Sequence, residues 1–225
     1  TRLLMVCHMV NITGQILPVR KICDMAHQKG VEVMVDGAHA FAHIKTSLKD
    51  LDCDYYGTSL HKWLSAPLGG GMLYIKKNKA ANLWPLFAEY PKEENDILRL
   101  NHTGTKPVHT DLGIAHAIEF HEKLGADRKE ARLRFLQNYW TNKVRNLPHI
   151  QLNTPEDPKR SCAIANVNVK GMDPHELATA LFEKYKIWTV AINRPGVIGC
   201  RITPNVYTST EELEVFVDAL TGLGK

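Results

Sequence analysis

Lys62 lies in an unusual setting for a lysine. It follows Ser59–His61 and precedes the glycines of Gly69–Gly71, with apolar Leu60 and Trp63 close by. Desolvation lowers the pKa of a lysine side chain, and the neutral amine is a nucleophile that forms a Schiff base with an aldehyde. An isolated lysine more often packs its stem and keeps its charge in water. Whether Lys62 is a reactive lysine or an ordinary surface lysine therefore depends on the motifs around it.

Three further polar residues have the chemistry to hold an aromatic nitrogen heterocycle. Asp36 ends the apolar run VEVMVD, and a carboxylate there keeps a pyridinium nitrogen protonated, which makes the ring an electron sink. His39 and Asn11 could hydrogen-bond a phenolic oxygen on such a ring. Taken singly, each is more often a turn residue, a helix cap or a structural histidine.

Donors for a phosphate group occur in two places. Ser59 and His61 offer a hydroxyl and an imidazole, and the segment HTGTK (102–106), which includes Gly104 and Thr105, offers backbone amides and hydroxyls. The structural alternatives are a strand end, a turn and an ordinary loop between domains.

The elements around these residues predict an α/β sheet. The apolar run at 3–10 predicts a strand buried on both faces, and further strands are predicted at 31–36, 53–60 and 70–77, with a helix between Pro18 and Gly30. Strands that alternate with helices favour a mostly parallel sheet, which binds ligands at the carboxyl ends of its strands. Asn11, Asp36 and the Ser59–Lys62 segment all follow such ends.

The pattern changes at Lys106. Two long helices are predicted at 109–125 and 126–147, then a half-buried strand at 162–171, a helix capped by Asp173, a strand at 199–206 and a terminal helix. We therefore expect two domains, 1–105 with the mostly parallel sheet and 106–225 as a smaller α+β domain.

Composition excludes several functional classes. The net charge is +4 over 225 residues without a dense Lys/Arg run, so neither nucleic acid nor a membrane surface is an expected partner. No apolar run is long enough to span a bilayer. The five cysteines form no CxxC pair, which is typical of free thiols in a reducing, cytoplasmic compartment.

Together and in this order, the motifs N-x-T-G, D-G-A-H, S-x-H-K, G-G-G and G-T resemble the class V aminotransferases. These are pyridoxal phosphate (PLP) enzymes that include cysteine desulfurases and isopenicillin N epimerases. The resemblance implies a PLP-binding large domain followed by a smaller α+β domain. It also implies that Lys62 carries PLP as an aldimine and that Asp36 binds the ring nitrogen.

The same resemblance implies the remaining site residues. His39 and Asn11 would contact the phenolic oxygen, while Ser59 and His61 would bind the phosphate. Gly104 and Thr105 match a loop that reaches the phosphate of a partner subunit, which implies a homodimer. Arg201 matches the arginine that binds the α-carboxylate of an amino-acid-like substrate, and a planar guanidinium suits that group.

The branch of the family is judged from the cysteines. A cysteine desulfurase or C–S lyase needs a reactive cysteine on a mobile loop before the arginine, but here that region is short and contains only Cys200. Neighbours in a strand point to opposite faces, so Cys200 should point away if Arg201 faces the substrate, and Cys162 has no recognisable loop. An isopenicillin N epimerase-like or aminotransferase-like enzyme is favoured, with the desulfurase as the alternative.

Two alternatives come from other classes. His39 and His43 have the i, i+4 spacing of a zinc hydrolase, but Ala40 stands where that motif has glutamate, so no metal is expected. The second alternative is a non-catalytic fragment. The resemblance implies a ring-stacking aromatic residue and a further phosphate loop before the position of Asn11, where this sequence has only ten residues. We therefore expect this chain to be the C-terminal part of a longer enzyme, inactive by itself and with an apolar sheet edge.

Overall fold

The computed structural model of the chain describes residues 1–87, 92–101, 104–105 and 108–223. The chain divides into two compact units. The first comprises Thr1–His8, Pro18–Ala42 and Thr46–Lys123, and the second comprises Met9–Leu17, His43–Lys45 and Leu124–Lys225. The predicted boundary at Lys106 lies outside the described residues and stays a prediction.

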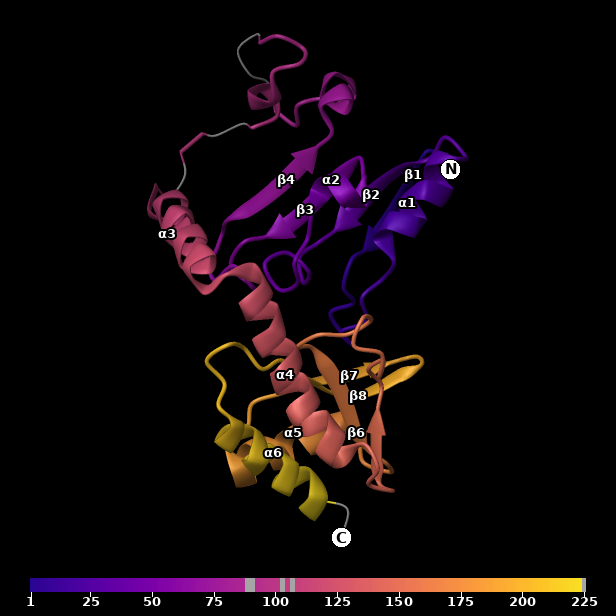
Figure 1. Cartoon of the computed structure of the whole chain (residues 1–225), viewed down its shortest axis with the longest axis vertical. Helices are drawn as coiled ribbons and strands as arrows, with labels where there is room; N and C mark the ends of the chain where they lie inside the picture. Colours follow the sequence, from indigo (N-terminus) through magenta and orange to yellow (C-terminus); the bar gives the residue numbers. More distant parts are fainter. Residues whose placement is uncertain (88–91, 102–103, 106–107, 224–225) are drawn as a thin grey trace. The chain divides into compact units, whose positions relative to one another are not determined.

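A four-stranded sheet forms the first unit (Figure 1). Its order is β1 (Leu3–Cys7), β2 (Glu32–Asp36), β3 (Tyr55–Ser59) and β4 (Gly71–Ile75). β1, β2 and β3 are parallel, and β4 pairs with β3 in the antiparallel sense. The prediction of an α/β fold with a mostly parallel sheet is therefore confirmed.

Helix α1 (Val19–His27) connects β1 to β2 and covers the centre of the sheet. Its buried residues Val19 and Cys23 pack with Val33, Val35 and Tyr56 in one apolar cluster. The other helical segments of this unit are α2 (Leu48–Leu51), the 3₁₀ helices η1 (Lys77–Asn82) and η2 (Ile97–Leu100), and α3 (Val108–Leu124).

Strand β1 differs from its prediction. It lies at the edge of the sheet, and Leu3 and Met5 are 48% and 64% exposed. The expectation of a strand buried on both faces is therefore wrong, because an apolar run does not reveal whether a second neighbour covers the strand. The expected apolar edge is present in the structure.

The second unit has an antiparallel sheet with helices on one face. The order is β5 (Ile150–Leu152), β6 (Ala165–Val169), β8 (Val197–Ile202) and β7 (Val190–Arg194). α4 (Ala126–Val144), α5 (Pro174–Tyr185) and α6 (Thr210–Gly222) supply the helices. Trp140 of α4 and Phe216 of α6 are buried in the core with their rings 5.1 Å apart, and Asp173 caps α5 as predicted.

Strand β6 is buried throughout, whereas the alternation of its sequence predicts a half-buried strand. Ala165, Val167 and Val169 belong to the core, but Asn166 and Asn168 on the opposite face are also buried. The polar face of this strand is therefore covered too, which alternation alone does not indicate.

The segment Met9–Leu17, which contains the motif N-x-T-G, packs in the second unit. Gly14 has φ of +73°, and a Cβ on it would lie 1.9 Å from the Ile164 carbonyl oxygen, so only glycine fits. The Thr154 hydroxyl donates to the Thr13 carbonyl at 2.8 Å. These contacts hold Asn11 beside the second sheet.

In the part of the chain that the structure describes, no helix combines the length and the apolar character needed to cross a membrane.

Candidate active site

The carboxyl ends of β1, β2 and β3 bring several site residues to one edge of the first sheet. Cys7 is the register partner of Asp36, and Asp36 is the register partner of Gly57. Ser59 ends β3 two residues later, and Lys62 follows in the next turn. Asp36 and Ser59 therefore lie on adjacent strands at the edge where parallel sheets bind ligands.

The Asp36 carboxylate is half-buried and held in place from two sides. Its Oδ1 accepts a hydrogen bond from the Ala38 amide at 2.9 Å, and its Oδ2 lies 4.0 Å from Cys7 Sγ. Burial raises the pKa of the Cys7 thiol, and the Asp36 charge raises it further, so this thiol stays protonated. Sequence reasoning missed Cys7, because only the strand register shows that it faces Asp36.

Gly37 packs directly against the ring of Tyr56. A Cβ on Gly37 would lie 2.0 Å from Tyr56 Cζ and 2.2 Å from its hydroxyl oxygen, and Tyr56 is fully buried. The same hydroxyl is 3.4 Å from His8 Nδ1, and burial lowers the pKa of His8 to about 4. The glycine after Asp36 is therefore needed for close packing, which fixes the backbone that carries the carboxylate.

Lys62 projects from a compact turn built on apolar residues. Leu60 and Leu64 are buried in a cluster that also includes Phe41 and Met72. The Ala66 amide donates to the Leu60 carbonyl at 3.1 Å and closes the turn. Lys62 itself is half-buried, and among the described residues its amine has no hydrogen bond or ion pair.

The predicted phosphate donors beside Lys62 are half-buried. Ser59 is the last residue of β3, and His61 precedes Lys62 in the same turn. His61 Nδ1 is buried and has no hydrogen-bond partner among the described residues. A buried imidazole nitrogen without a partner is costly, and a ligand oxygen would satisfy it.

The remaining predicted residues of the first unit lie in a turn and a bend. His39 is half-buried in the turn that follows β2. Gly104 and Thr105 are exposed in a bend, while His102, Thr103 and Lys106 of the same motif lie outside the described residues.

Arg201 and Asn11 meet in the second unit. The Arg201 guanidinium Nη1 donates to the Asn11 backbone carbonyl at 3.3 Å. Arg201 is half-buried, burial lowers its pKa, and its Nε is buried without a partner among the described residues. This arrangement leaves a desolvated cation able to bind an anion.

The two candidate reactive cysteines are buried thiols. Cys200 is fully buried and faces the core, with its Sγ 3.4 Å from the Pro174 carbonyl, and burial raises its pKa. Burial raises the pKa of Cys162 to about 12. The region before Arg201 is the hairpin of β7 and β8, joined by Pro195 and Gly196, so it has no long loop to carry a thiol.

The zinc alternative finds no support. Residues 38–43 form turns rather than the helix that places two histidines on one face, and the buried His43 accepts the Ala163 amide on its Nε2 at 3.0 Å. No cluster of three metal-ligating side chains occurs in the described part of the chain.

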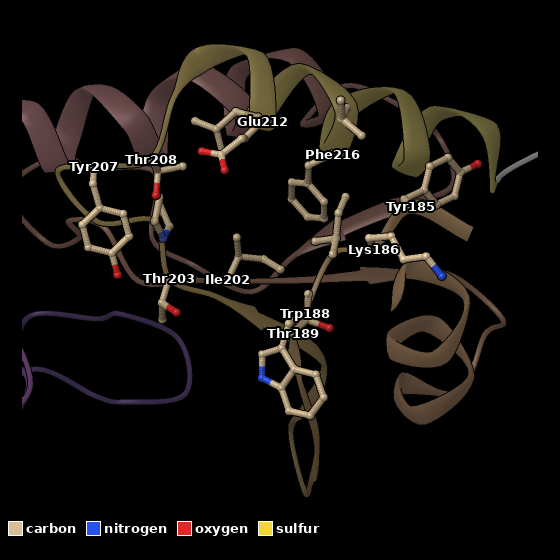
Figure 2. Close-up of a pocket in the computed structure, with 14 residues that line it drawn as sticks. Tyr185, Lys186, Trp188, Thr189, Ile202, Thr203, Tyr207, Thr208, Glu212 and Phe216 are labelled. Atoms are coloured by element: carbon tan, nitrogen blue, oxygen red, sulfur yellow. The ribbon is translucent and has the colours of Figure 1, made fainter. Parts of the chain in front are cut away.

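A separate cavity of about 440 Å³ lies between α6 and the strand β8 of the second unit (Figure 2). Figure 2 shows Phe216 and Ile202 between Tyr207 at one end and Lys186 at the other. None of the described residues predicted for the site lines this cavity. Ile202 points into it, so the adjacent Arg201 is on the opposite face of the sheet.

Comparison with known proteins identifies the family. Residues 1–196 match the model of the aminotransferase class-V family. The chain is 31% identical to isopenicillin N epimerase from Streptomyces clavuligerus, with 99% of this chain and 60% of the relative covered. It is 29% identical to a cysteine desulfurase from Escherichia coli, with 98% and 58% covered.

A solved structure agrees with this assignment. The apo cysteine desulfurase from Thermococcus onnurineus superposes with a TM-score of 0.89 at 25% identity, covering 99% of this chain and 60% of that one. The chain thus spans about 60% of the length of these relatives. Class V aminotransferases use pyridoxal phosphate. With a match over 196 of 225 residues, this chain belongs to the aminotransferase class-V family.

Proposed function

We propose that this protein is a PLP-dependent enzyme that acts on an amino acid or amine, with an isopenicillin N epimerase-like or aminotransferase-like activity. The observation that carries the proposal is the half-buried amine of Lys62, which has no partner among the described residues and follows the strand next to Asp36. A lysine without a salt bridge is available to react as a nucleophile.

The donors in the first unit fit the parts of PLP. Asp36 is the anion for the ring nitrogen, Ser59 and His61 are donors for the phosphate, and His39 is a donor for the phenolic oxygen. The unsatisfied Nδ1 of His61 supports this assignment, because a phosphate oxygen is the acceptor it lacks. When bound, PLP supplies an electron sink for a bond broken at the α-carbon of a substrate.

The chain's own residues then bind the substrate and move its proton. Arg201 binds the substrate carboxylate through its planar guanidinium, and Asn11 lies beside it. The Nζ of Lys62, freed when the substrate amine displaces it from the cofactor, would be the base that takes the α-proton and returns it. Return of the proton to the opposite face of the α-carbon, from a second acid, would give an epimer, whereas transfer of the proton to the cofactor instead of the α-carbon would lead to transamination.

Cysteine desulfurase activity is the less favoured alternative. That reaction needs an accessible thiolate near the substrate, whereas Cys162 and Cys200 are fully buried with raised pKa values. Cys7 is exposed overall and lies beside Asp36 in the sheet, but partial burial of its thiol and the Asp36 charge raise its pKa. Cys7 is therefore not the accessible thiolate that this reaction needs.

The test is reduction of the PLP-loaded protein with borohydride, followed by peptide mapping. The pyridoxyl group is expected on Lys62, and Lys62→Ala should lose both the label and the visible absorbance of the cofactor. Lys45→Ala is the matched control, because Lys45 is exposed and paired with Asp127 at 3.0 Å, and it should be labelled like the wild type. A label on another lysine, such as Lys106, would refute the assignment.

We also propose that the protein acts as a homodimer in the cytoplasm. Gly104 and Thr105 are exposed, as residues that reach a partner subunit would be, and all five cysteines are free thiols, which suits a reducing compartment. Light scattering of the purified protein tests the dimer, and a monomer at micromolar concentration would contradict it.

A further inference from the structure

A chain of carboxamides runs across the second sheet and ends next to Arg201. Gln151 Nε2 donates to Asn153 Oδ1 at 2.8 Å, and Asn153 Nδ2 donates to Asn166 Oδ1 at 2.7 Å. Asn153 Nδ2 also donates to the Ile198 carbonyl at 2.9 Å. The three side chains therefore form one directed series of hydrogen bonds.

The direction of this series is fixed by the Ile198 carbonyl. Because a carbonyl only accepts, Asn153 must present its NH₂ group there, and the same group then requires the oxygen of Asn166. Gly199 leaves the space for this oxygen, since a Cβ on Gly199 would lie 2.6 Å from Asn166 Oδ1. The NH₂ group of Asn166 consequently points away from Asn153.

This NH₂ group is a buried donor without an acceptor. Asn166 is 0% exposed, and its Nδ2 has no partner among the described residues. A buried donor that lacks an acceptor destabilises the free protein, because it has lost its hydrogen bonds to water without replacing them. A position that bears this cost in the free protein is a candidate for a contact that forms with a ligand.

Arg201 presents the same deficiency on the same face of the sheet. It is the register partner of Asn166 in the β6–β8 pair, and opposite residues of an antiparallel pair project to one side. Its Nε is buried without an acceptor, and the only hydrogen bond of its guanidinium among the described residues is the long one to the Asn11 carbonyl. Burial lowers its pKa by removing water from the cation.

We propose that Asn166 is a second donor, acting together with Arg201, for the carboxylate of the ligand. This inference rests on the proposed function, in which Arg201 binds that carboxylate. A carboxylate has two oxygens that only accept, so it satisfies both donors, whereas a carboxamide offers one acceptor oxygen. Both nitrogens are buried in the unliganded chain, and the Arg201 guanidinium also donates a hydrogen bond to the Asn11 carbonyl. Binding of the carboxylate would exchange that bond for one to a carboxylate oxygen.

The test uses nuclear magnetic resonance of the ¹⁵N-labelled protein without cofactor. Sodium propionate is the probe, and propionamide is its neutral control. Propionate is expected to shift the side-chain signals of Asn166 Nδ2 and Arg201 Nε with one common dissociation constant, and propionamide is expected to shift neither. If propionate leaves the Asn166 signal in place, the proposal is overturned.

A variant series gives a second, independent measurement. Asn166→Leu removes the donor without adding charge and should weaken propionate binding about tenfold, or ~1.4 kcal/mol. Asn168→Leu is the matched control on the same strand and face, because Asn168 Nδ2 already donates to the Met172 carbonyl, and it should change the affinity less than about twofold. Equal affinities for Asn166→Leu and wild type would overturn the proposal.

The outcomes separate this inference from the proposed function. If Arg201→Lys weakens propionate binding but Asn166→Leu does not, Asn166 has no part in the site while Arg201 keeps its role. If both weaken it, Asn166 is established whatever lysine carries the cofactor, because PLP is absent from the assay. Borohydride labelling of Lys62 tests the proposed function by itself.

Discussion

Replacing Gly37 by alanine should destabilise the first sheet severely. The new Cβ would lie 2.0–2.2 Å from two ring carbons and the hydroxyl oxygen of Tyr56, whereas carbon atoms at contact are about 3.5–4.0 Å apart. The overlap is therefore about 1.5 Å. Tyr56 is 0% exposed and packs with Val33 and Val35, so its ring cannot turn out of the way. We expect a loss of at least about 3 kcal/mol, at the upper end of the usual cost of overpacking.

The assay is urea unfolding followed by circular dichroism, with linear extrapolation to water. Gly57→Ala is the matched control on the neighbouring strand, since its Cβ would meet only the Met34 methyl group at 3.9 Å, an ordinary contact. The control should stay within about 1 kcal/mol of the wild type. Hydrogen exchange at the β2 amides shows whether the loss is in this sheet.

A double-mutant cycle identifies the clash as the cause. Tyr56→Leu removes the ring and leaves space for the alanine methyl group. The double variant should therefore be more stable than the sum of the single losses predicts, by at least about 1 kcal/mol. The reasoning is refuted if Gly37→Ala unfolds like the control, or if the two losses simply add.

Four other predictions follow from the site and the buried groups. Asp36→Asn should keep the cofactor but lower the turnover of the PLP-loaded protein more than about tenfold, or ~1.4 kcal/mol in the barrier, and a smaller loss would make Asp36 structural. Arg201→Lys should mainly raise the dissociation constant of an amino acid, because a point charge replaces a planar fork, and an unchanged constant would place the carboxylate elsewhere. The pKa of His8 is lowered from 6.5 to about 4, so its contribution to stability is complete above pH 6.5 and is lost as the pH falls toward 4. That contribution is about 3 kcal/mol, and a histidine titration near 6.5 by magnetic resonance would contradict it. Burial alone would raise the pKa of Asp54, but hydrogen bonds from a backbone amide and from His27 outweigh it and lower the pKa, so its contribution is lost only as the pH falls below about 4. Asp54→Ala should cost about 1–3 kcal/mol at pH 7 by urea unfolding, since it leaves the buried Val33 amide without the carboxylate acceptor that it has at 2.8 Å, and an unchanged stability would contradict this.

Local patterns in the sequence predict most of the secondary structure and the strand-end positions of the first unit. Asp36 ends β2 as predicted, and β3 ends at Ser59, one residue before its predicted end, because a short apolar run bounded by polar residues marks a buried strand. Lys62 follows in a turn. Strand β7 was missed, although VAINRPGVIG has the alternating runs and the Pro-Gly turn of a hairpin.

Contacts between residues that are far apart in the sequence could not be predicted. The edge position of β1 depends on which strands pair, and the burial of Asn166 depends on what covers its face. Thr13 and Thr154 are hydrogen-bonded across 141 positions of the chain. Strand register and long-range packing leave no pattern in neighbouring residues. The contact between Cys7 and Asp36 could therefore not be predicted from the sequence either.

The second unit is built from three separate stretches of the chain, which restricts where two homologous genes can be joined to give a stable chimera. A junction near residue 124 exchanges only the last of these stretches, because the unit also includes Met9–Leu17 and His43–Lys45. A chimera joined there would combine Ile164 of one parent with Gly14 of another, across a contact that tolerates no Cβ. Successful crossovers should therefore exchange residues 9–17 and 43–45 together with everything from residue 124 onward.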